Sequence, residues 1–402
     1  MPVSARKKDR KLNIAMVGHK RIPSREGGIE IVVEELSTRL VKMGHKVTCY
    51  NRNGHHVGGT KFDTYQGKEY KGVTLKYVPT VDIKGMAAVT SSFLGALGSA
   101  FGRYDVVHFH AEGPCAMLWI PKLLRKKCVV TIHGIDWKRE KWKSGWGSQY
   151  IRMGEKCAVR YADQIIVLNK NTYEYFKNIY GRDTVIIPNG LGKQKIRNAG
   201  LIRDKFGIDK DEYILFLGRL VPEKGVHYLI KAYKNLETDK KLVIAGGVSD
   251  SQDYVMTIKA LAGDDRRILF TDFVQGALLE ELYSNAYVYV LPSDLEGMPL
   301  SLLEAMGYGN CCLVSDIPEC MEVVGDKGVV FKRGDAGDLQ DKLQMLCDSR
   351  EVVENYKNVA SDFVYQKYNW TDMAQKTEGL YKRLAQGYRD TFTIENDLGG
   401  KV

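Results

Sequence analysis

The sequence lacks long hydrophobic runs and any regular spacing of cysteines, and each absence excludes a class of protein. Its longest uncharged stretch, residues 85–102, is diluted by Gly, Ser and Thr, so it predicts a packed helix rather than a membrane span. The basic start of the chain, residues 1–11, is followed by no apolar segment, which argues against a secretory signal. The eight cysteines show no metal-binding or disulfide spacing and are expected to be small buried side chains in a reducing compartment. We therefore expect a cytoplasmic protein.

A dinucleotide-binding fingerprint is also missing, although the start of the chain is typical of a βαβ unit. An expected strand at residues 12–18 leads through Gly27-Gly28 into an amphipathic run at 31–43 and a second strand at 45–50. The turn lacks the G-x-G-x-x-G spacing of dinucleotide-binding folds. Adjacent glycines at a helix start allow an anion to approach the backbone amides. A plain tight turn explains them equally well.

What the sequence does contain is an alternation of strands and helices over 402 residues, a length typical of two domains. The second half repeats the pattern, with strands expected at residues 213–217, 241–245, 267–271, 286–291, 310–315 and 328–331. Such alternation favours an α/β fold with mostly parallel sheets. The break at Pro188-Asn189-Gly190 predicts a domain boundary. We expect one domain at 1–190, a second at 200–370, and a final helix with a frayed tail at 371–402.

The net charge of +10 is unevenly distributed. Residues 1–200 hold 35 basic and 16 acidic side chains, a balance of +19, and the remainder has a balance of −9. Such asymmetry points to an anionic partner for the first half. Nucleic acid, an anionic membrane surface and an anionic substrate are all compatible with it.

Two carboxylates bracket an expected helix start in the second half. Glu296 follows the apolar strand 287–291, Pro299 suits the first helical turn, and Glu304 lies beyond that turn. In parallel α/β sheets, ligands collect in loops at the carboxyl ends of the strands. The first-turn amides would bind an anion and each Glu would accept from hydroxyl groups, which is the layout of a nucleotide sugar. The alternative is a capped surface helix whose acids favour its positive end.

Basic and imidazole side chains occupy similar places after other expected strands. Arg219 and Lys224 lie between a strand and a helix start, where they could form a cationic clamp for phosphates or a solvated loop. His110 and His133 each fall at a strand carboxyl end, and the alternative for both is a structural histidine.

Tryptophans and basic residues alternate in WKREKWKSGW, residues 137–146. That mixture suits contact with anionic lipid or a lipid-linked sugar. Stacking on single-stranded nucleic acid needs the same ingredients. A solvated loop with its tryptophans tucked against the domain is the third interpretation.

Four motifs in order give the chain a family resemblance. They are GGIE at 27–30, IIPNG at 186–190, GRLVPEKG at 218–225 and EGMPLSLLEAMGYG at 296–309, in which Glu296 and Glu304 form an E-x7-E pair. From about residue 12 to 388 the chain resembles the family-4 retaining glycosyltransferases of the GT-B fold. The GGIE loop and HGIDWKREKW at 133–142 are similar to a subset that assembles bacterial surface polysaccharides, including rhamnosyltransferase-like members.

The resemblance implies two Rossmann-like domains facing across a cleft, with the acceptor on the N-terminal domain and the nucleotide sugar on the C-terminal one. The final helix would cross back onto the N-terminal domain. The resemblance assigns catalysis to His133, Glu296, Arg219 and Lys224. It assigns donor binding to Gly27, Gly28, Val274, Gly297, Met298, Leu300 and Glu304. It assigns acceptor binding to His110, Trp137 and Lys138. Within these groups the cations would hold the diphosphate, Glu304 the ribose and Glu296 the donor sugar. His133 would lie near that sugar, as a base or only as a contact.

The resemblance also implies retention by front-face attack without a covalent enzyme intermediate. Many glycosyltransferases hold a metal with an Asp-x-Asp motif. The one literal match, Asp209-Lys210-Asp211, lies in a polar loop before a strand and is interpreted as chance. Because Arg219, Lys224 and a helix N-terminus can stabilise the leaving diphosphate, we expect no metal or other cofactor.

The expected partners are a UDP-, GDP- or dTDP-sugar, a glycan or polyprenyl-diphosphate-linked acceptor, and an anionic membrane surface at the inner face of the cell membrane. No motif of a nucleic-acid reader is present, so no nucleic acid is expected. The alternative function is a nucleotide-sugar epimerase or another sugar-phosphate enzyme of the same fold. A phosphorylase would need a pyridoxal-phosphate lysine, and no lysine lies in such a context.

Overall fold

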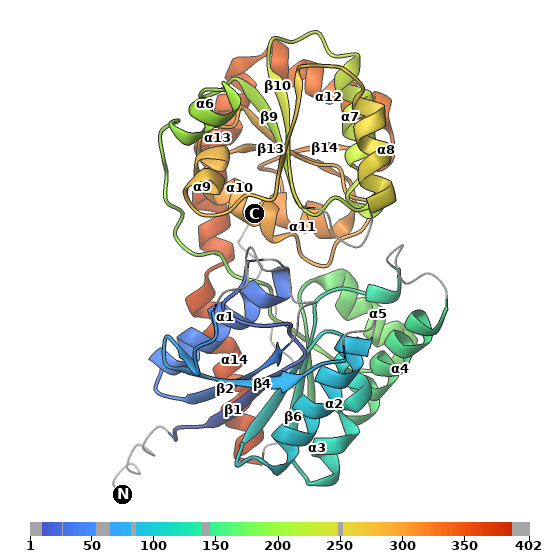
Figure 1. The fold of residues 1–402 in the computed structure, drawn as a ribbon, viewed down its shortest axis with the longest axis vertical. Helices are drawn as coiled ribbons and strands as arrows, with labels where there is room; N and C mark the ends of the chain where they lie inside the picture. The colour runs from blue at the N-terminus through green and yellow to red at the C-terminus, as the bar shows by residue number, and fades with distance from the viewer. Residues whose placement is uncertain are drawn as a thin grey trace, which may run out of the picture. The chain divides into compact units, whose positions relative to one another are not determined.

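The structure is a computed structural model that describes residues 10–25, 27–53, 65–81, 86–138, 145–247 and 252–387. The chain divides into two compact units (Figure 1). The N-terminal unit comprises residues 1–189 and 370–402, and the C-terminal unit comprises residues 190–369. The tail expected at 388–402 and the middle of the tryptophan-rich stretch, residues 139–144, lie outside the described residues.

The N-terminal unit is built on an eight-stranded sheet in the order β3-β4-β2-β1-β5-β6-β7-β8. All neighbouring strands pair in parallel except β3 and β4, which are antiparallel. The strands are β1 Asn13–Val17, β2 Lys46–Asn53, β3 Glu69–Tyr70, β4 Val73–Pro79, β5 Val106–His110, β6 Lys127–Ile132, β7 Gln164–Val167 and β8 Val185–Ile186. Strands such as β5 are buried at every residue, as expected for a parallel sheet covered on both faces.

Helices cover both faces of this sheet. They are α1 Gly28–Lys42, α2 Met86–Phe101, η1 Gly113–Met117, α3 Trp119–Leu123, η2 Asp136–Lys138, α4 Trp146–Tyr161, α5 Lys170–Tyr180 and α14 Trp370–Ala385. Small residues of α2 and apolar residues of α4 and α5 share one core with the central strands. The C-terminal helix α14 packs against α1, so the end of the chain completes the N-terminal unit.

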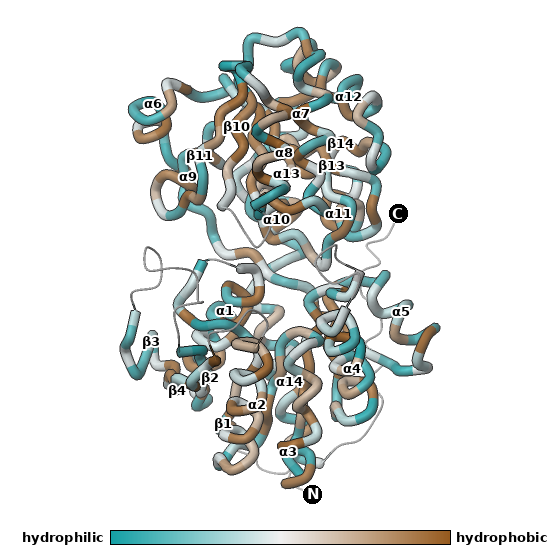
Figure 2. The backbone as a smooth tube through the Cα atoms, turned by 45° about the vertical axis from the view of Figure 1, so that its right-hand side comes forward, coloured by the Kyte–Doolittle hydropathy of each residue, from teal (hydrophilic) through white to brown (hydrophobic). Residues whose placement is uncertain are grey.

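The C-terminal unit has six parallel strands in the order β11-β10-β9-β12-β13-β14. They are β9 Tyr213–Leu217, β10 Lys241–Ala245, β11 Ile268–Asp272, β12 Val288–Leu291, β13 Cys311–Ser315 and β14 Val329–Phe331. Numbered within the unit this is 3-2-1-4-5-6, the order of a Rossmann fold. Figure 2 shows hydrophobic residues concentrated in its strands, for example β10. The predicted α/β fold with two Rossmann-like domains is confirmed.

The helices of this unit follow the strands in alternation. They are α6 Leu201–Phe206, η4 Pro222–Lys224, α7 Val226–Lys234, α8 Gln252–Ala262, α9 Ala277–Ser284, α10 Leu300–Gly307, α11 Pro318–Val324, α12 Ala336–Asp348 and α13 Arg350–Lys367. Across the described parts of both units, no helix combines the length and the apolar character needed to cross a bilayer.

Candidate active site

The C-terminal sheet reverses its strand order between β9 and β12, and a crevice for ligands is expected there. The loop after β9 carries Lys224, and the loop after β12 carries Glu296. The backbone joins the two loops, because the amide of Asp294 donates to the carbonyl of Glu223 at 2.8 Å. Gly225 allows this approach: its φ is +66°, and a Cβ there would lie 1.9 Å from the carbonyl oxygen of Pro292. Only glycine fits that conformation and that contact.

Lys224 and Glu296 form a direct ion pair at this crevice. The Lys224 ammonium donates to Oε1 of Glu296 at 2.5 Å, and the hydroxyl of Ser293 donates to the same oxygen at 2.7 Å. The two charged side chains are 12% and 8% exposed. At such burial the pair is fixed in place but still reaches solvent. The sequence predicted both residues for the site but gave no sign that they contact each other.

The helix that follows β12 begins one residue later than the sequence indicated. Pro299 is the N-cap residue of α10 rather than part of its first turn. The amides of Leu302 and Leu303 bond back to its carbonyl, at 3.1 and 3.2 Å, while the amides of Leu300 and Ser301 belong to the first turn, where a helix offers N–H groups to an anion. The structure thus places a helix N-terminus between Glu296 and Glu304 at a sheet switch point, and the anion site there stays a prediction.

Glu304 lies in the second turn of α10, and Tyr283 of α9 donates to its Oε2 at 3.2 Å. Burial, followed by the charge of Glu304, raises the pKa of the Tyr283 hydroxyl well above its ordinary value. The hydroxyl therefore stays protonated, and its single proton is shared between Glu304 and the carbonyl oxygen of Ser301, which also lies at 3.2 Å. The carboxylate keeps further lone pairs with which it can accept from a ligand hydroxyl.

The other donor-site residues of the sequence prediction lie at or near the same edge. Arg219 is exposed directly after β9, and Gly297 is buried after β12. Met298 and Leu300 are partly buried and pack against the core of the unit. Val274 follows β11 and is only 9% exposed, so its side chain is part of the hydrophobic core of the C-terminal unit.

The N-terminal sheet reverses its order between β1 and β5, and its histidines gather there. Nδ1 of His110 lies 3.1 Å from Nε2 of His133, and His108 is held by the hydroxyls of Tyr381 and Thr131 at 2.5 and 2.7 Å. All three imidazoles are buried. Burial lowers the pKa of His108 to about 3 and that of His110 well below its ordinary value. Both are therefore neutral near pH 7 and act as hydrogen-bonding groups, not as cations.

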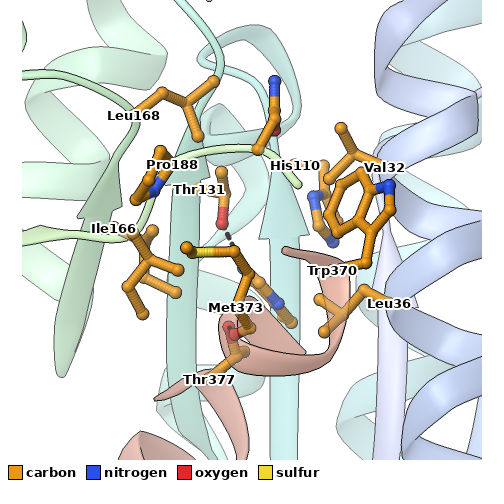
Figure 3. Close-up of a pocket in the computed structure, with 13 residues that line it drawn as sticks. Val32, Leu36, His110, Thr131, Ile166, Leu168, Pro188, Trp370, Met373 and Thr377 are labelled. Carbon is orange, nitrogen blue, oxygen red and sulfur yellow. Dashed lines mark hydrogen bonds between the residues drawn. The ribbon is translucent and has the colours of Figure 1, made fainter. Parts of the chain in front are cut away.

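A small cavity adjoins these histidines. Its volume of about 30 Å³ has room for roughly one water molecule, which is far too small for a sugar. Figure 3 shows His110 and Thr131 on one side, with Trp370, Met373 and Thr377 of α14 closing it. We interpret it as a packing gap beneath the sheet edge and not as a substrate pocket.

Gly27 and Gly28 lie at the start of α1, as predicted. Gly27 is the N-cap residue with extended backbone (φ −150°), and Gly28 is the first helical residue. A Cβ on Gly27 would lie 2.2 Å from Oε2 of Glu30, whose other oxygen accepts from the amide of Lys20 at 2.9 Å. The buried Glu30 thus ties the loop after β1 to the first turn of α1, and a side chain at Gly27 would require its carboxylate to shift.

The acceptor-site residues proposed from the tryptophan-rich stretch differ in their surroundings. Trp137 is partly buried, its indole N–H donates to Glu155 at 3.2 Å, and the guanidinium of Arg152 lies 4.4 Å from its ring centre. Trp137 is therefore tucked against the domain, while Trp146 at the start of α4 is 90% exposed. Lys138 ends η2, and its side chain lies outside what the structure describes.

Sequence reasoning missed the buried carboxyls Glu112 and Glu155. Both are almost fully buried within the N-terminal unit, next to the turn that follows His133. Glu112 had a usable signal, because it comes two residues after a strand that ends in histidine. Glu155 had none, since one acid among the basic residues of an amphipathic helix looks solvated.

Comparisons with known proteins agree with this architecture. Residues 26–193 match the family described as Glycosyltransferase Family 4, and residues 199–363 match Glycosyl transferases group 1. An uncharacterized glycosyltransferase of Methanocaldococcus jannaschii is 30% identical over 413 residues, which cover 92% of this chain and 98% of the relative.

A second relative is the UDP-Gal:alpha-D-GlcNAc-diphosphoundecaprenol alpha-1,3-galactosyltransferase of Escherichia coli. It is 27% identical over 296 residues, which cover 69% of this chain and 75% of the relative. Among solved structures, sucrose-phosphate synthase from Thermosynechococcus elongatus has a TM-score of 0.78 at 19% identity, covering 94% of this chain and 100% of that one. The structural likeness extends over both units and concerns the fold.

Proposed function

Because this chain belongs to the glycosyltransferases of family 4, with their two-domain GT-B fold, we propose that it transfers a glycosyl group from a nucleotide-diphosphate sugar to a glycan or polyprenyl-diphosphate-linked acceptor. The observation that carries the donor half is the Lys224–Glu296 pair at the switch point of the C-terminal sheet. The acceptor half is supported by the diphosphoundecaprenol-linked acceptor that the Escherichia coli relative's name states.

The charge that develops on the leaving group decides the roles of the two loops. A departing nucleoside diphosphate gains negative charge, which a fixed cation and a helix N-terminus stabilise without moving. Ser293 donates to Glu296, and Glu296 accepts one hydrogen bond from the Lys224 ammonium. The other two ammonium protons remain for phosphate oxygens. Arg219, exposed on the same loop, would contact the diphosphate as well.

The carboxylates position the two ends of the donor. Glu296 accepts from Lys224 and Ser293 with one oxygen, and its second oxygen can accept from a sugar hydroxyl. Glu304 lies in the second turn of α10 and accepts from Tyr283, and it suits the ribose hydroxyls. The family resemblance also assigns His133 a role at the donor sugar.

Metal-independent transfer is part of the proposal. The Asp209-x-Asp211 match cannot act as a free ligand pair as it stands, because Asp209 pairs with Arg203 and Asp211 with Lys357. Turnover is expected to be unchanged by EDTA. If EDTA abolishes turnover and Mg²⁺ or Mn²⁺ restores it, this part of the proposal is wrong.

The central test is a panel of UDP-, GDP- and dTDP-sugars measured for protection against thermal unfolding. A ligand that binds the native state raises its stability by mass action, by about 2.7 kcal/mol at a hundredfold excess over Kd. One nucleotide is expected to protect the wild type and to lose that effect in Lys224→Ala. Equal protection of the variant would remove Lys224 from the donor site, and no protection by any nucleotide would contradict the proposed donor class.

The finer assignments follow the family resemblance. We propose retention of anomeric configuration and a place in the assembly of capsule, exopolysaccharide or other cell-surface glycans, within the rhamnosyltransferase-like subset. Nuclear magnetic resonance of the product formed from an α-linked donor reads the configuration directly. An α-product is expected, and a β-product would exclude retention.

We propose peripheral association with an anionic membrane surface through the N-terminal unit. The helices α2 and α3 pack together, and α2 has no charged residue. Arg103 and Arg125 are exposed beside the two helices, which complements anionic lipid headgroups. The exposed apolar side chains on and directly after these helices are Met86, Phe93, Leu97, Phe101, Trp119, Leu123 and Leu124.

Vesicle co-sedimentation tests this surface. The double variant Phe101→Ser/Leu123→Ser removes two side chains that are 75% and 71% exposed, and it is expected to lower binding to anionic vesicles at least tenfold. Ile179→Ser, which removes an exposed side chain of α5, is the matched control and should bind normally. Equal binding of the wild type to neutral and anionic vesicles would contradict the electrostatic part.

A further inference from the structure

Two buried carboxyls lie under the segment 133–138, which carries His133 and Trp137. Glu112 is fully buried between β5 and η1, and its Oε2 accepts from the amide of Asp136 at 2.9 Å. Glu155, buried on α4, accepts from the indole N–H of Trp137 at 3.2 Å. One carboxyl therefore holds the backbone of this segment and the other holds its largest side chain.

Counting hydrogen-bond donors assigns the protons of the two acids. Glu155 accepts from three donors, the indole of Trp137 and the hydroxyls of Tyr175 and Tyr180. A carboxylate with three donors is satisfied as an anion. Among the described residues, Glu112 accepts from one backbone amide, and its buried Oε1 accepts from no donor. An anion on Glu112 would be buried almost unsatisfied beside a second anion, so Glu112 is the protonated member.

Among the described residues, most groups around Glu112 disfavour its charge, and the bond from the amide of Asp136 favours it. Burial raises its pKa well above the ordinary value, and the charges of Asp136 from η2 and Glu155 from α4 raise it further, as does hydrogen bonding with Glu155. From its own turn the Cys115 thiol faces it, and burial keeps that thiol protonated with a raised pKa. The close packing depends on Gly154, where a Cβ would lie 2.0 Å from the carbonyl oxygen of Glu112.

We propose that Glu112 and Glu155 act as a proton-sharing positioning pair that holds the segment 133–138 at the switch point of the N-terminal sheet. Neither acid contacts the reacting atoms. Ionisation of Glu112, as pH rises through its raised pKa, places two carboxylates side by side, and their repulsion disturbs the packing against the segment 133–138. The effect on catalysis rests on the proposed function, since it acts through His133 and the acceptor side of the site.

The two acids should respond differently to the same isosteric change. Glu112→Gln reproduces a protonated acid, because its amide oxygen accepts from Asp136 and its amide nitrogen donates toward Glu155. Glu155→Gln turns an amide nitrogen toward groups that already donate, among them the indole N–H of Trp137, which cannot accept. We expect Glu112→Gln to be tolerated and Glu155→Gln to be destabilised at every pH.

The experiment measures thermal unfolding of both variants and the wild type from about pH 5 to about pH 9. The raised folded pKa of Glu112 means that its stabilising contribution is complete below about 4.3, the unfolded pKa of Glu, and is lost as pH rises through the folded value. The wild type should therefore lose Tm toward alkaline pH, and Glu112→Gln should lose less and exceed it there. Glu174→Gln, an exposed acid on α5, is the control and should follow the wild type.

A transfer assay adds the functional readout. With the donor selected by the nucleotide panel, kcat/KM of Glu112→Gln should stay within about twofold of the wild type at pH 6 and lack its alkaline decline. The inference is wrong if Glu112→Gln is as unstable as Glu155→Gln. It is also wrong if kcat/KM of Glu112→Gln declines with rising pH in the same way as that of the wild type. The unfolding result does not depend on catalysis, so a chain without transferase activity would contradict the proposed function and leave the proton assignment standing.

Discussion

The two sheets place their polar residues at the same topological position but give them opposite electrostatics. At the switch point of the C-terminal sheet, Lys224 and Glu296 form a charged pair that reaches solvent. At the switch point of the N-terminal sheet, His108 and His110 are buried and held neutral by lowered pKa values. A parallel sheet thus provides a place for a site, and the residues in its first loops decide whether that site suits an anion or an uncharged hydroxyl.

The largest expected effect comes from removing either member of the charged pair in the C-terminal unit. Lys224→Ala and Glu296→Ala should each lower kcat/KM by about 10²–10³-fold, because a fixed cation at the leaving group, or the carboxylate that fixes it, is gone. The double variant should lose little more than either single variant, since the two residues act as a unit. Steady-state kinetics with the donor chosen by thermal protection measures all three.

A matched control separates catalysis from folding. Lys357 and Asp211 form an ion pair of similar burial in the same unit, with the atoms 2.6 Å apart. Removal of one partner from a buried pair destabilises by about 3–5 kcal/mol. Asp211 keeps a second partner, Arg350 at 3.2 Å, so Lys357→Ala should lower the Tm by less than such a loss while it keeps turnover. Equal loss of turnover in both variants would mean that stability, and not the donor site, explains the effect.

Sequence periodicity was enough to predict the positions of the C-terminal strands, because each is a short apolar run between helical segments. It also placed Lys224 and Glu296 in loops at strand carboxyl ends. It could not predict their ion pair, which depends on β9 and β12 being neighbours although the short helix η4, three α-helices and two strands separate them in the chain. The sheet order is a tertiary property, and local spacing carries no record of it.

The buried acids show the same limit more sharply. Nothing in the sequence near Glu155 reveals that Trp137 of η2 and both Tyr175 and Tyr180 of α5 will converge on its carboxylate. Gly154 offered a weak signal, since a glycine inside an amphipathic helix needs a packing reason. That reason is the close approach to Glu112, which only the folded unit displays.

A smaller effect tests whether the geometry of the charged loop depends on its backbone. Gly225→Ala should destabilise the C-terminal unit by roughly 3 kcal/mol or more, because it combines a left-handed φ with a Cβ 1.9 Å from Pro292. Gly207→Ala has a similar φ of +59° but open space around its Cβ, so it isolates the conformational part at about 1–2 kcal/mol. Chemical denaturation measures both. Equal losses would show that the contact with Pro292 contributes nothing.

The smallest effect concerns the neutral side of the comparison and appears as a pH slope. Burial lowers the pKa of His19 to about 4 and that of His108 to about 3. Near pH 6.5 these histidines therefore bind protons in the unfolded chain but not in the folded chain. The stability that these groups contribute is present above about pH 6.5 and is lost as pH falls, by about 1.4 kcal/mol per pH unit for each histidine. Between about pH 6.5 and 5 Glu112 contributes an opposite slope, because its raised folded pKa makes stability fall as pH rises, so denaturant unfolding in the Glu112→Gln background reports the histidines.

Two substitutions at His108 separate its titration from its hydrogen bonds. His108→Gln removes the imidazole, and it should reduce the slope by about one proton while an amide still bonds to Thr131 or Tyr381. Tyr381→Phe removes only the hydroxyl, so it should lower stability at every pH by about 1–3 kcal/mol and leave the slope unchanged. If His108→Gln keeps the full slope, the imidazole is protonated in the folded protein. The edge of the N-terminal sheet would then carry charge, and the contrast between the two units would fail.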